Sequence, residues 1–113
     1  MTEEVKKRAV AKMCRINDID KENDLRVSVV GSVVNIDDKN LFFTIDDGEK
    51  QVNVLLNNSE ELKKLKLGGI VRIIGIVMGF NQGFEIRSEI IQDFTGINIK
   101  YYNKLLDLLK QKN

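Results

Sequence analysis

The sequence predicts an all-β domain with added helices: a five-stranded Greek-key barrel that carries one helix at each end. Two observations support this prediction. Short segments rich in β-branched and aromatic residues alternate between apolar and polar positions, and turn residues separate them. In addition, Gly75 interrupts the long strand-like segment 70–80. A glycine inside a strand usually marks the bulge or bend that a small barrel needs to close.

The expected chain order is three strands, a short helix and two further strands. The residues 46–48, Asp-Asp-Gly, are a strong hairpin signal between the second and third strands. Asn58 or Ser59 caps the short helix, and Gly68 with Gly69 ends it. The alternating pattern places the strands over residues 25–36, 41–45, 51–56, 70–80 and 84–93.

Amphipathic segments predict a helix at each end of the barrel. Apolar residues lie near helical spacing over residues 3–14, and again after Gly96. We therefore expect a single domain, residues 1–113. Its parts are an N-terminal helix and connector over 1–24, the barrel over 25–96 and a C-terminal helix over 97–113.

The composition argues against an enzyme. The chain has 113 residues with no histidine and a single cysteine, Cys14, so the commonest general base and the usual zinc ligands are missing. The acidic pairs at 37–38 and 46–47 are interpreted as turns rather than metal or catalytic sites. No catalytic residue, metal or cofactor is predicted. The first residues are charged rather than apolar, so a cytoplasmic location is expected.

The distribution of charge limits what the barrel is expected to bind alone. The net charge is +1, but residues 25–96 hold eight basic and ten acidic side chains. Because affinity for nucleic acid depends strongly on neutralising phosphates, tight binding by this segment alone is not expected. A local basic groove remains compatible with the count.

Several short motifs follow one another in a characteristic order. They are Val-Val-Gly at 29–31, Phe-Thr-Ile-Asp-Asp-Gly at 43–48, Gly-Gly-Ile-Val-Arg-Ile-Ile-Gly at 68–75 and Phe-Asn-Gln at 80–82, followed by an apolar C-terminal helix. With these motifs, residues 25–110 resemble the middle-sized subunit of replication protein A and related Stn1-type OB folds.

The resemblance implies an OB-fold barrel and a place in a single-stranded-DNA-binding complex of replication, repair or recombination. It also implies that the C-terminal helix packs against another OB-fold protein. Because little of the sequence lies outside the barrel, the chain is similar to a compact, archaeal form of the family. Regulation through a serine-rich tail or a winged-helix domain is not expected to carry over.

Aromatic side chains are the first candidate contacts. Phe80 and Phe84 flank the loop between the last two strands, where bases can stack on them. Phe42 is out of phase with Phe43, so we expect it on the outer, concave surface. Two structural alternatives stay open: Phe84 points into the barrel in line with Ile86, or a helix covers Phe42.

Polar and basic residues complete the candidate site. Arg72 and Arg87 interrupt otherwise apolar strands, which favours them over other cations as contacts to phosphates or bases. Ordinary solvent exposure is the alternative explanation for each lysine and arginine. The predicted nucleic-acid contacts are Lys39, Phe42, Thr44, Lys50, Gln51, Asn53, Leu55, Arg72, Phe80, Asn81, Gln82, Phe84 and Arg87.

The C-terminal helix carries an apolar stripe wider than one barrel end needs. Such a stripe indicates two contacts, one with the barrel and one with another chain. Packing only on the barrel or on residues 5–14 is the alternative. The predicted interface consists of Ile97, Tyr101, Tyr102, Leu105, Leu106, Leu108 and Leu109.

Three functions are therefore compared, and the first is favoured. The chain is expected to be a single-stranded-DNA-binding OB-fold subunit of a replication protein A-like complex. The alternatives are an OB-fold scaffold that binds only proteins, supported by the slightly acidic barrel, and an OB-fold module for RNA or tRNA.

Overall fold

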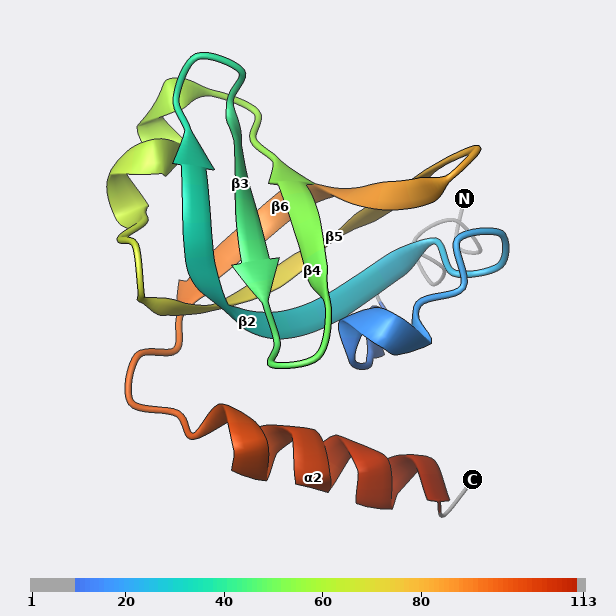
Figure 1. Ribbon diagram of the computed structural model, residues 1–113. Helices are drawn as coiled ribbons and strands as arrows, with labels where there is room; N and C mark the ends of the chain where they lie inside the picture. The colour runs from blue at the N-terminus through green and yellow to red at the C-terminus, as the bar shows by residue number, and fades with distance from the viewer. Residues whose placement is uncertain (1–9, 112–113) are drawn as a thin grey trace.

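The predicted barrel is confirmed by a computed structural model, which describes residues 10–111 (Figure 1). The neighbouring strands follow the order β1-β2-β3-β4-β6-β5, and β2 also pairs with β5, which closes β2 to β6 into a five-stranded barrel. The strands are β1 (Lys12–Met13), β2 (Arg26–Asp37), β3 (Phe42–Asp46), β4 (Gln51–Leu55), β5 (Ile70–Phe80) and β6 (Gly83–Asp93). The helices are the 3-10 helices η1 (Ile16–Asp18) and η2 (Ser59–Lys64) and the α-helix α2 (Ile99–Gln111).

The barrel closes through one short parallel contact. β4 and β6 pair only at Val54 with Ile86 and at Leu55 with Arg87, whereas β5 and β6 pair along nearly their whole length. Away from this contact β4 and β6 diverge. All five barrel strands contribute large, fully buried side chains, and Ile16 of η1 adds another; those of the strands are Val27, Val29, Val33, Phe43, Ile45, Val54, Ile73 and Ile86.

Gly75 lies at the irregularity that the sequence predicts. The register between β5 and β6 shifts between Ile74 and Gly75, so β6 passes unusually close to the β5 backbone. A Cβ atom at position 75 would clash with the carbonyl oxygen of Arg87 and would lie 2.7 Å from Cγ2 of Ile86. The glycine is therefore required by a close approach of two strands rather than by a turn.

Gly75→Ala is expected to lower the free energy of unfolding by roughly 2–3 kcal/mol, because overpacking a well-packed interior shifts backbone and side chains. Gly83→Ala is the control, since its Cβ would meet the ring of Phe80 at 3.6 Å, an ordinary contact. Urea denaturation should show a lower midpoint for Gly75→Ala alone. Equal midpoints for the two variants would contradict the tight approach.

The N-terminal helix predicted over residues 3–14 is wrong where the structure describes it. Lys12 and Met13 pair in parallel with Val27 and Ser28 as β1. A strand edge offers unpaired backbone groups, and this short segment uses the edge of β2. Residues 3–9 of the predicted helix lie outside the described residues. Cys14 is buried, and burial raises the pKa of its thiol to about 11.

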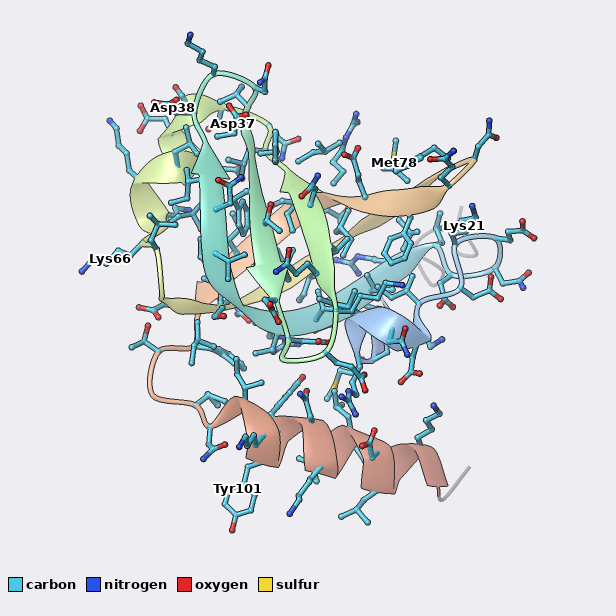
Figure 2. The ribbon with its side chains drawn as sticks, in the orientation of Figure 1. Lys21, Asp37, Asp38, Lys66, Met78 and Tyr101 are labelled. Atoms are coloured by element: carbon cyan, nitrogen blue, oxygen red, sulfur yellow. The ribbon has the colours of Figure 1, made fainter. Side chains whose placement is uncertain are left out.

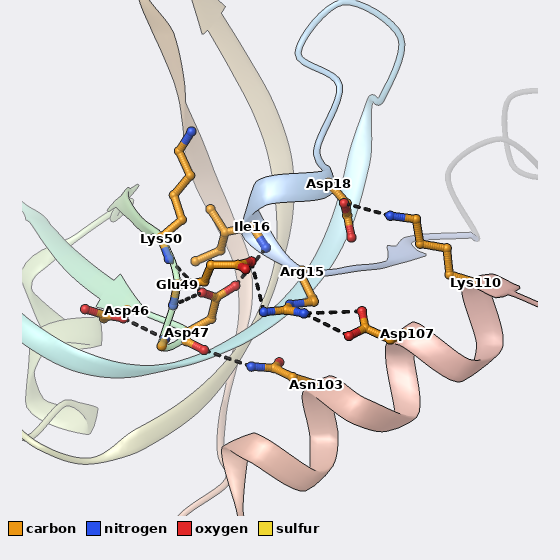
Figure 3. Close-up of polar contacts among 11 residues, drawn as sticks. Arg15, Ile16, Asp18, Asp46, Asp47, Glu49, Lys50, Asn103, Asp107 and Lys110 are labelled. Atoms are coloured by element: carbon orange, nitrogen blue, oxygen red, sulfur yellow. Dashed lines mark hydrogen bonds and ion pairs between the residues drawn. The ribbon is translucent and has the colours of Figure 1, made fainter.

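The β3–β4 hairpin turn is built around a buried carboxylate (Figure 3). Asp47 is 1% exposed. Its Oδ1 accepts hydrogen bonds from the backbone N–H groups of Glu49 and Lys50, both at 3.0 Å. Its Oδ2 accepts one from the N–H of Ile16, also at 3.0 Å. The turn interpretation is thus confirmed, and the same side chain additionally ties the hairpin to η1.

Helix α2 is fastened to this turn by polar contacts (Figure 3). The side-chain amide of Asn103 donates to the carbonyl oxygen of Asp47 at 2.9 Å. Arg15 forms ion pairs with Glu49 at 2.9 Å and with Asp107 at 3.0 Å. One side of α2 therefore contacts the barrel and the connector of the same chain.

The two sides of α2 differ in exposure. Asn98 accepts a hydrogen bond from the N–H of Tyr101 at 3.1 Å and caps the helix start. Leu106 is buried, and Tyr102 is half-buried, which raises the pKa of its phenol. These two predicted interface residues are thus at least partly covered by the domain itself. The other five are exposed: Ile97, Tyr101, Leu105, Leu108 and Leu109.

Candidate nucleic-acid interface

A groove lies where β4 and β6 diverge. Its walls are the first half of β4 with the preceding turn, and the end of the β5–β6 hairpin. Seven of the thirteen predicted contacts line it, together with Val52 and Gly83; the seven are Thr44, Lys50, Gln51, Asn53, Phe80, Gln82 and Phe84.

One wall is a projecting hairpin, which we call the arm and define as residues 78–85. Figure 1 shows the β5–β6 hairpin extending beyond the barrel. Phe80 is 52% exposed on the arm, as a ring that stacks on a base must be. Phe84 is half-buried and packs against the core, so the alternative that it points inward in line with Ile86 agrees with its packing. Phe84 also lines the groove, so its ring lies between the core and the solvent.

The outer face of β3 and β4 continues from the groove. Phe42 pairs with Leu55 and Thr44 with Asn53. Directly paired residues point to the same side of a sheet. The alternating residues Phe43 and Val54 are fully buried, which places the other four on the outer face, as the alternation predicts.

Arg87 extends this outer face onto β6. It pairs with Leu55 across the parallel contact and is exposed. Its guanidinium therefore belongs to the same surface as Phe42, at the point where the barrel closes. A ring, an apolar side chain and a cation in one row suit a nucleotide, because a base stacks while its phosphate meets the cation.

The amide side chains of the groove are held in fixed orientations. The hydroxyl of Thr44 donates to Oδ1 of Asn53 at 2.8 Å. The side-chain nitrogen of Gln51 donates to Oδ2 of Asp46 at 3.0 Å. These bonds leave the Asn53 amino group as a donor and the Gln51 carbonyl oxygen as an acceptor, the two kinds of group that recognise base edges.

Lys39 lies apart from the groove, in the loop between β2 and β3. Asp37 closes this loop by accepting hydrogen bonds from the N–H groups of Asn40 at 2.9 Å and Lys39 at 3.1 Å. These bonds to Asn40 and Lys39 lower the pKa of Asp37, with Asn40 contributing most. Figure 2 shows Asp37 and Asp38 at the end of the barrel away from the arm. Lys39 can therefore contact only a nucleic-acid strand that runs along the outer face of β3 and β4.

Arg72, another predicted nucleic-acid contact, does not line the groove and makes its contacts within the domain. Its Nε donates to the hydroxyl of Ser28 at 3.0 Å, and its guanidinium lies 5.9 Å from the centre of the Phe94 ring. Its charge also acts on Tyr102 of α2. Arg72 is half-buried, and its guanidinium is therefore engaged by the domain's own residues rather than presented in the groove.

Lys21 is a neighbour of the site that sequence reasoning missed. Its ammonium group donates to the carbonyl oxygen of Phe80 at 2.6 Å and to that of Asn81 at 3.2 Å. Figure 2 shows it on the connector before β2, close to the arm. The predicted contact Asn81 thus lies at the tip of the arm. The sequence around Lys21 is a run of charged and polar residues, 20–24, which carries no signal for such a contact.

The described side chains and helices include neither a metal-binding cluster nor a membrane-spanning helix. Among residues 10–111, no group of three or more His, Cys, Asp or Glu side chains is placed to hold a metal ion. No helix in the same part of the chain is long and apolar enough to cross a membrane.

The sequence from residue 27 to 94, more than half of the chain, matches the family described as the OB-fold nucleic acid binding domain. The chain belongs to this family. The match covers all five barrel strands of the OB-fold domain except the first residue of β2. No curated protein matches the sequence.

Solved structures resemble most of this chain. A chain of the S. pombe Stn1–Ten1 complex is similar with a TM-score of 0.68 and 20% identity, covering 92% of this chain and 95% of that one. The S. pombe telomere capping protein Ten1 gives 0.69 and 20%, over 90% and 99%. A chain of a replication protein A heterotrimer bound to single-stranded DNA gives 0.65 and 18%, over 82% and 77%. At these identities the similarity shows the fold.

Proposed function

We propose that this OB-fold domain is a single-stranded-DNA-binding subunit of a replication protein A-like complex that acts in DNA replication or repair in the cytoplasm. The observation that carries the proposal is the groove, because it joins an exposed ring, oriented amides and a lysine. The similar structures support it, since one is a replication protein A heterotrimer bound to single-stranded DNA. The domain would bind without catalysing a reaction and without a cofactor.

The single-stranded DNA would cross the outer face of β3 and β4 and enter the groove beside the arm. Bases would stack on Phe80 and on Phe42, while Asn53 and Gln51 meet their edges. Phosphates would contact Lys50 in the groove, with Arg87 and Lys39 farther along the outer face. The few cations and the slightly acidic barrel predict weak, salt-sensitive binding by this chain alone.

A second OB-fold protein would pack on the exposed side of α2. Tyr101 is 74% exposed and points away from the barrel in Figure 2. With Leu105 at 51% and Leu108 at 58%, it forms an apolar strip on a helix whose other side is already occupied. Similar structures occur in the S. pombe Stn1–Ten1 complex and in a replication protein A heterotrimer, which supports a role as one subunit of a complex.

The exposed side of α2 also favours one alternative, an OB-fold scaffold that assembles a complex without touching nucleic acid. Apolar surface of this kind marks protein interfaces. The proposals differ in one measurable property, since only the first requires the isolated chain to bind an oligonucleotide.

The test is a titration of fluorescent oligo-dT with the purified protein at low and moderate salt. We expect weak binding that Lys50→Met reduces, with the slope of log affinity against log salt falling by about 0.7 for each lost phosphate contact. Competition with unlabelled DNA and RNA of the same length separates DNA binding from RNA binding. Absence of binding at high protein concentration would favour the scaffold.

A further inference from the structure

The connector before β2 contains a turn that its own side chains make rigid. Asp20 accepts hydrogen bonds from the N–H groups of Glu22 at 3.0 Å and Asn23 at 3.3 Å, and from the Asn23 amide at 2.7 Å. The Asn23 side chain is the main cause of the lowered pKa of Asp20. Asp24 accepts from the N–H of Asp20 at 2.8 Å and from Lys12 at 2.9 Å.

This turn holds Lys21 against the arm. The ammonium group of Lys21 binds the two consecutive carbonyl oxygens of Phe80 and Asn81, at 2.6 Å and 3.2 Å. The backbones are also close, because a Cβ atom on Gly79 would lie 3.4 Å from the carbonyl oxygen of Lys21. Two of the three ammonium donors are therefore used within the protein.

The arm needs such support. The backbone N–H of Val77 donates to the carbonyl oxygen of Leu25 at 2.9 Å. This is the last backbone hydrogen bond that joins β5 to β2 and the connector before it. Beyond it, Met78 to Phe80 pair with Glu85 to Gly83 of β6. A two-stranded ribbon is marginally stable in water by itself, so an ammonium that binds both carbonyls at its bend restricts where Phe80 can be.

We propose that Lys21 is a positioning residue, which fixes the arm so that the Phe80 ring is presented to a nucleic-acid base. The inference rests on the proposed function, and it deepens that function by assigning the residue that orders the stacking ring. Lys21 acts through the arm backbone rather than by contacting a phosphate.

The first experiment needs no ligand. Hydrogen exchange of the arm amides is measured in the free protein for the wild type, Lys21→Met and Lys63→Met. Lys63 is an exposed lysine of η2 that forms an ion pair with Glu60 at 3.6 Å, and it serves as the matched control. We expect roughly three-fold or faster exchange in the arm for Lys21→Met alone, because local opening becomes easier. Unchanged exchange would overturn the positioning role.

The second experiment separates positioning from phosphate contact. Lys21→Met is expected to weaken oligo-dT binding roughly five-fold, less than complete loss of the stacking ring, and Lys21→Arg to recover part of it. The salt dependence should keep its slope, whereas a lost phosphate contact lowers the slope by about 0.7. In a Phe80→Ala background Lys21→Met should have no further effect.

The outcomes of the two proposals are distinguishable. A reduced salt slope, or a Lys21→Met effect that persists without Phe80, would overturn the positioning role while leaving DNA binding intact. If the wild-type chain binds no oligonucleotide, the proposed function fails, and hydrogen exchange alone decides whether Lys21 orders the arm.

Discussion

Phe80→Ala is expected to weaken binding of single-stranded oligo-dT by about 5- to 150-fold, because stacking of one base on an aromatic ring contributes about 1–3 kcal/mol. Phe80 is the exposed ring of the groove, on the arm that projects beyond the barrel. The fold should be unaffected, since more than half of the side chain is in solvent. Fluorescence anisotropy with a labelled oligonucleotide measures the effect.

Tyr101→Ala is the matched control for this prediction. It removes an even more exposed ring, from the side of α2 that faces away from the barrel. Oligonucleotide affinity should stay within about two-fold of wild type, because scattered surface substitutions change little beyond their own contacts. If both variants bind equally well, the groove is not the stacking site, and Phe42 on the outer face becomes the next candidate.

Asp47→Ala is expected to lower the free energy of unfolding by about 3 kcal/mol or more. The substitution leaves three buried or half-buried backbone N–H groups, those of Ile16, Glu49 and Lys50, without their acceptor. An unsatisfied buried donor costs about 1–3 kcal/mol. Asp47→Asn should be less harmful, because its remaining side-chain oxygen still accepts two of these bonds.

Urea denaturation followed by circular dichroism measures this effect, with the slope checked for unchanged two-state behaviour. Asp38→Ala is the control, since Asp38 is an exposed residue of the β2–β3 loop, visible at the end of the barrel in Figure 2. Similar midpoints for the two alanine variants would mean that the turn does not depend on its buried carboxylate.

The sequence predicts the barrel well because each strand carries its own local signal. The alternation of Phe42 with Phe43 predicts which side chain is buried, and the structure agrees. Gly75 likewise predicts an irregularity that the register of β5 and β6 contains. Both inferences depend only on neighbours along the chain and on the two-residue period of a strand.

The failures concern contacts between distant segments. The segment 10–14 has a spacing compatible with a helix, but Lys12 and Met13 pair with β2. Arg72 interrupts an apolar strand as a ligand contact would, yet its guanidinium bonds to Ser28 and lies near the Phe94 ring, outside the groove. Lys21 approaches Phe80 across fifty-nine positions in sequence. No local pattern encodes such a meeting, because it depends on how the finished barrel places the connector.

The shape of the arm has a consequence for how the domain opens. Because its outer residues are held by each other and by Lys21 rather than by the rest of the sheet, the arm should behave as a separate unit of low local stability. The arm amides should exchange long before those of β2 and β3, because these two strands carry the fully buried Val29 and Phe43. Binding and release of a nucleic-acid strand would then require only local opening of the arm, while the barrel stays folded.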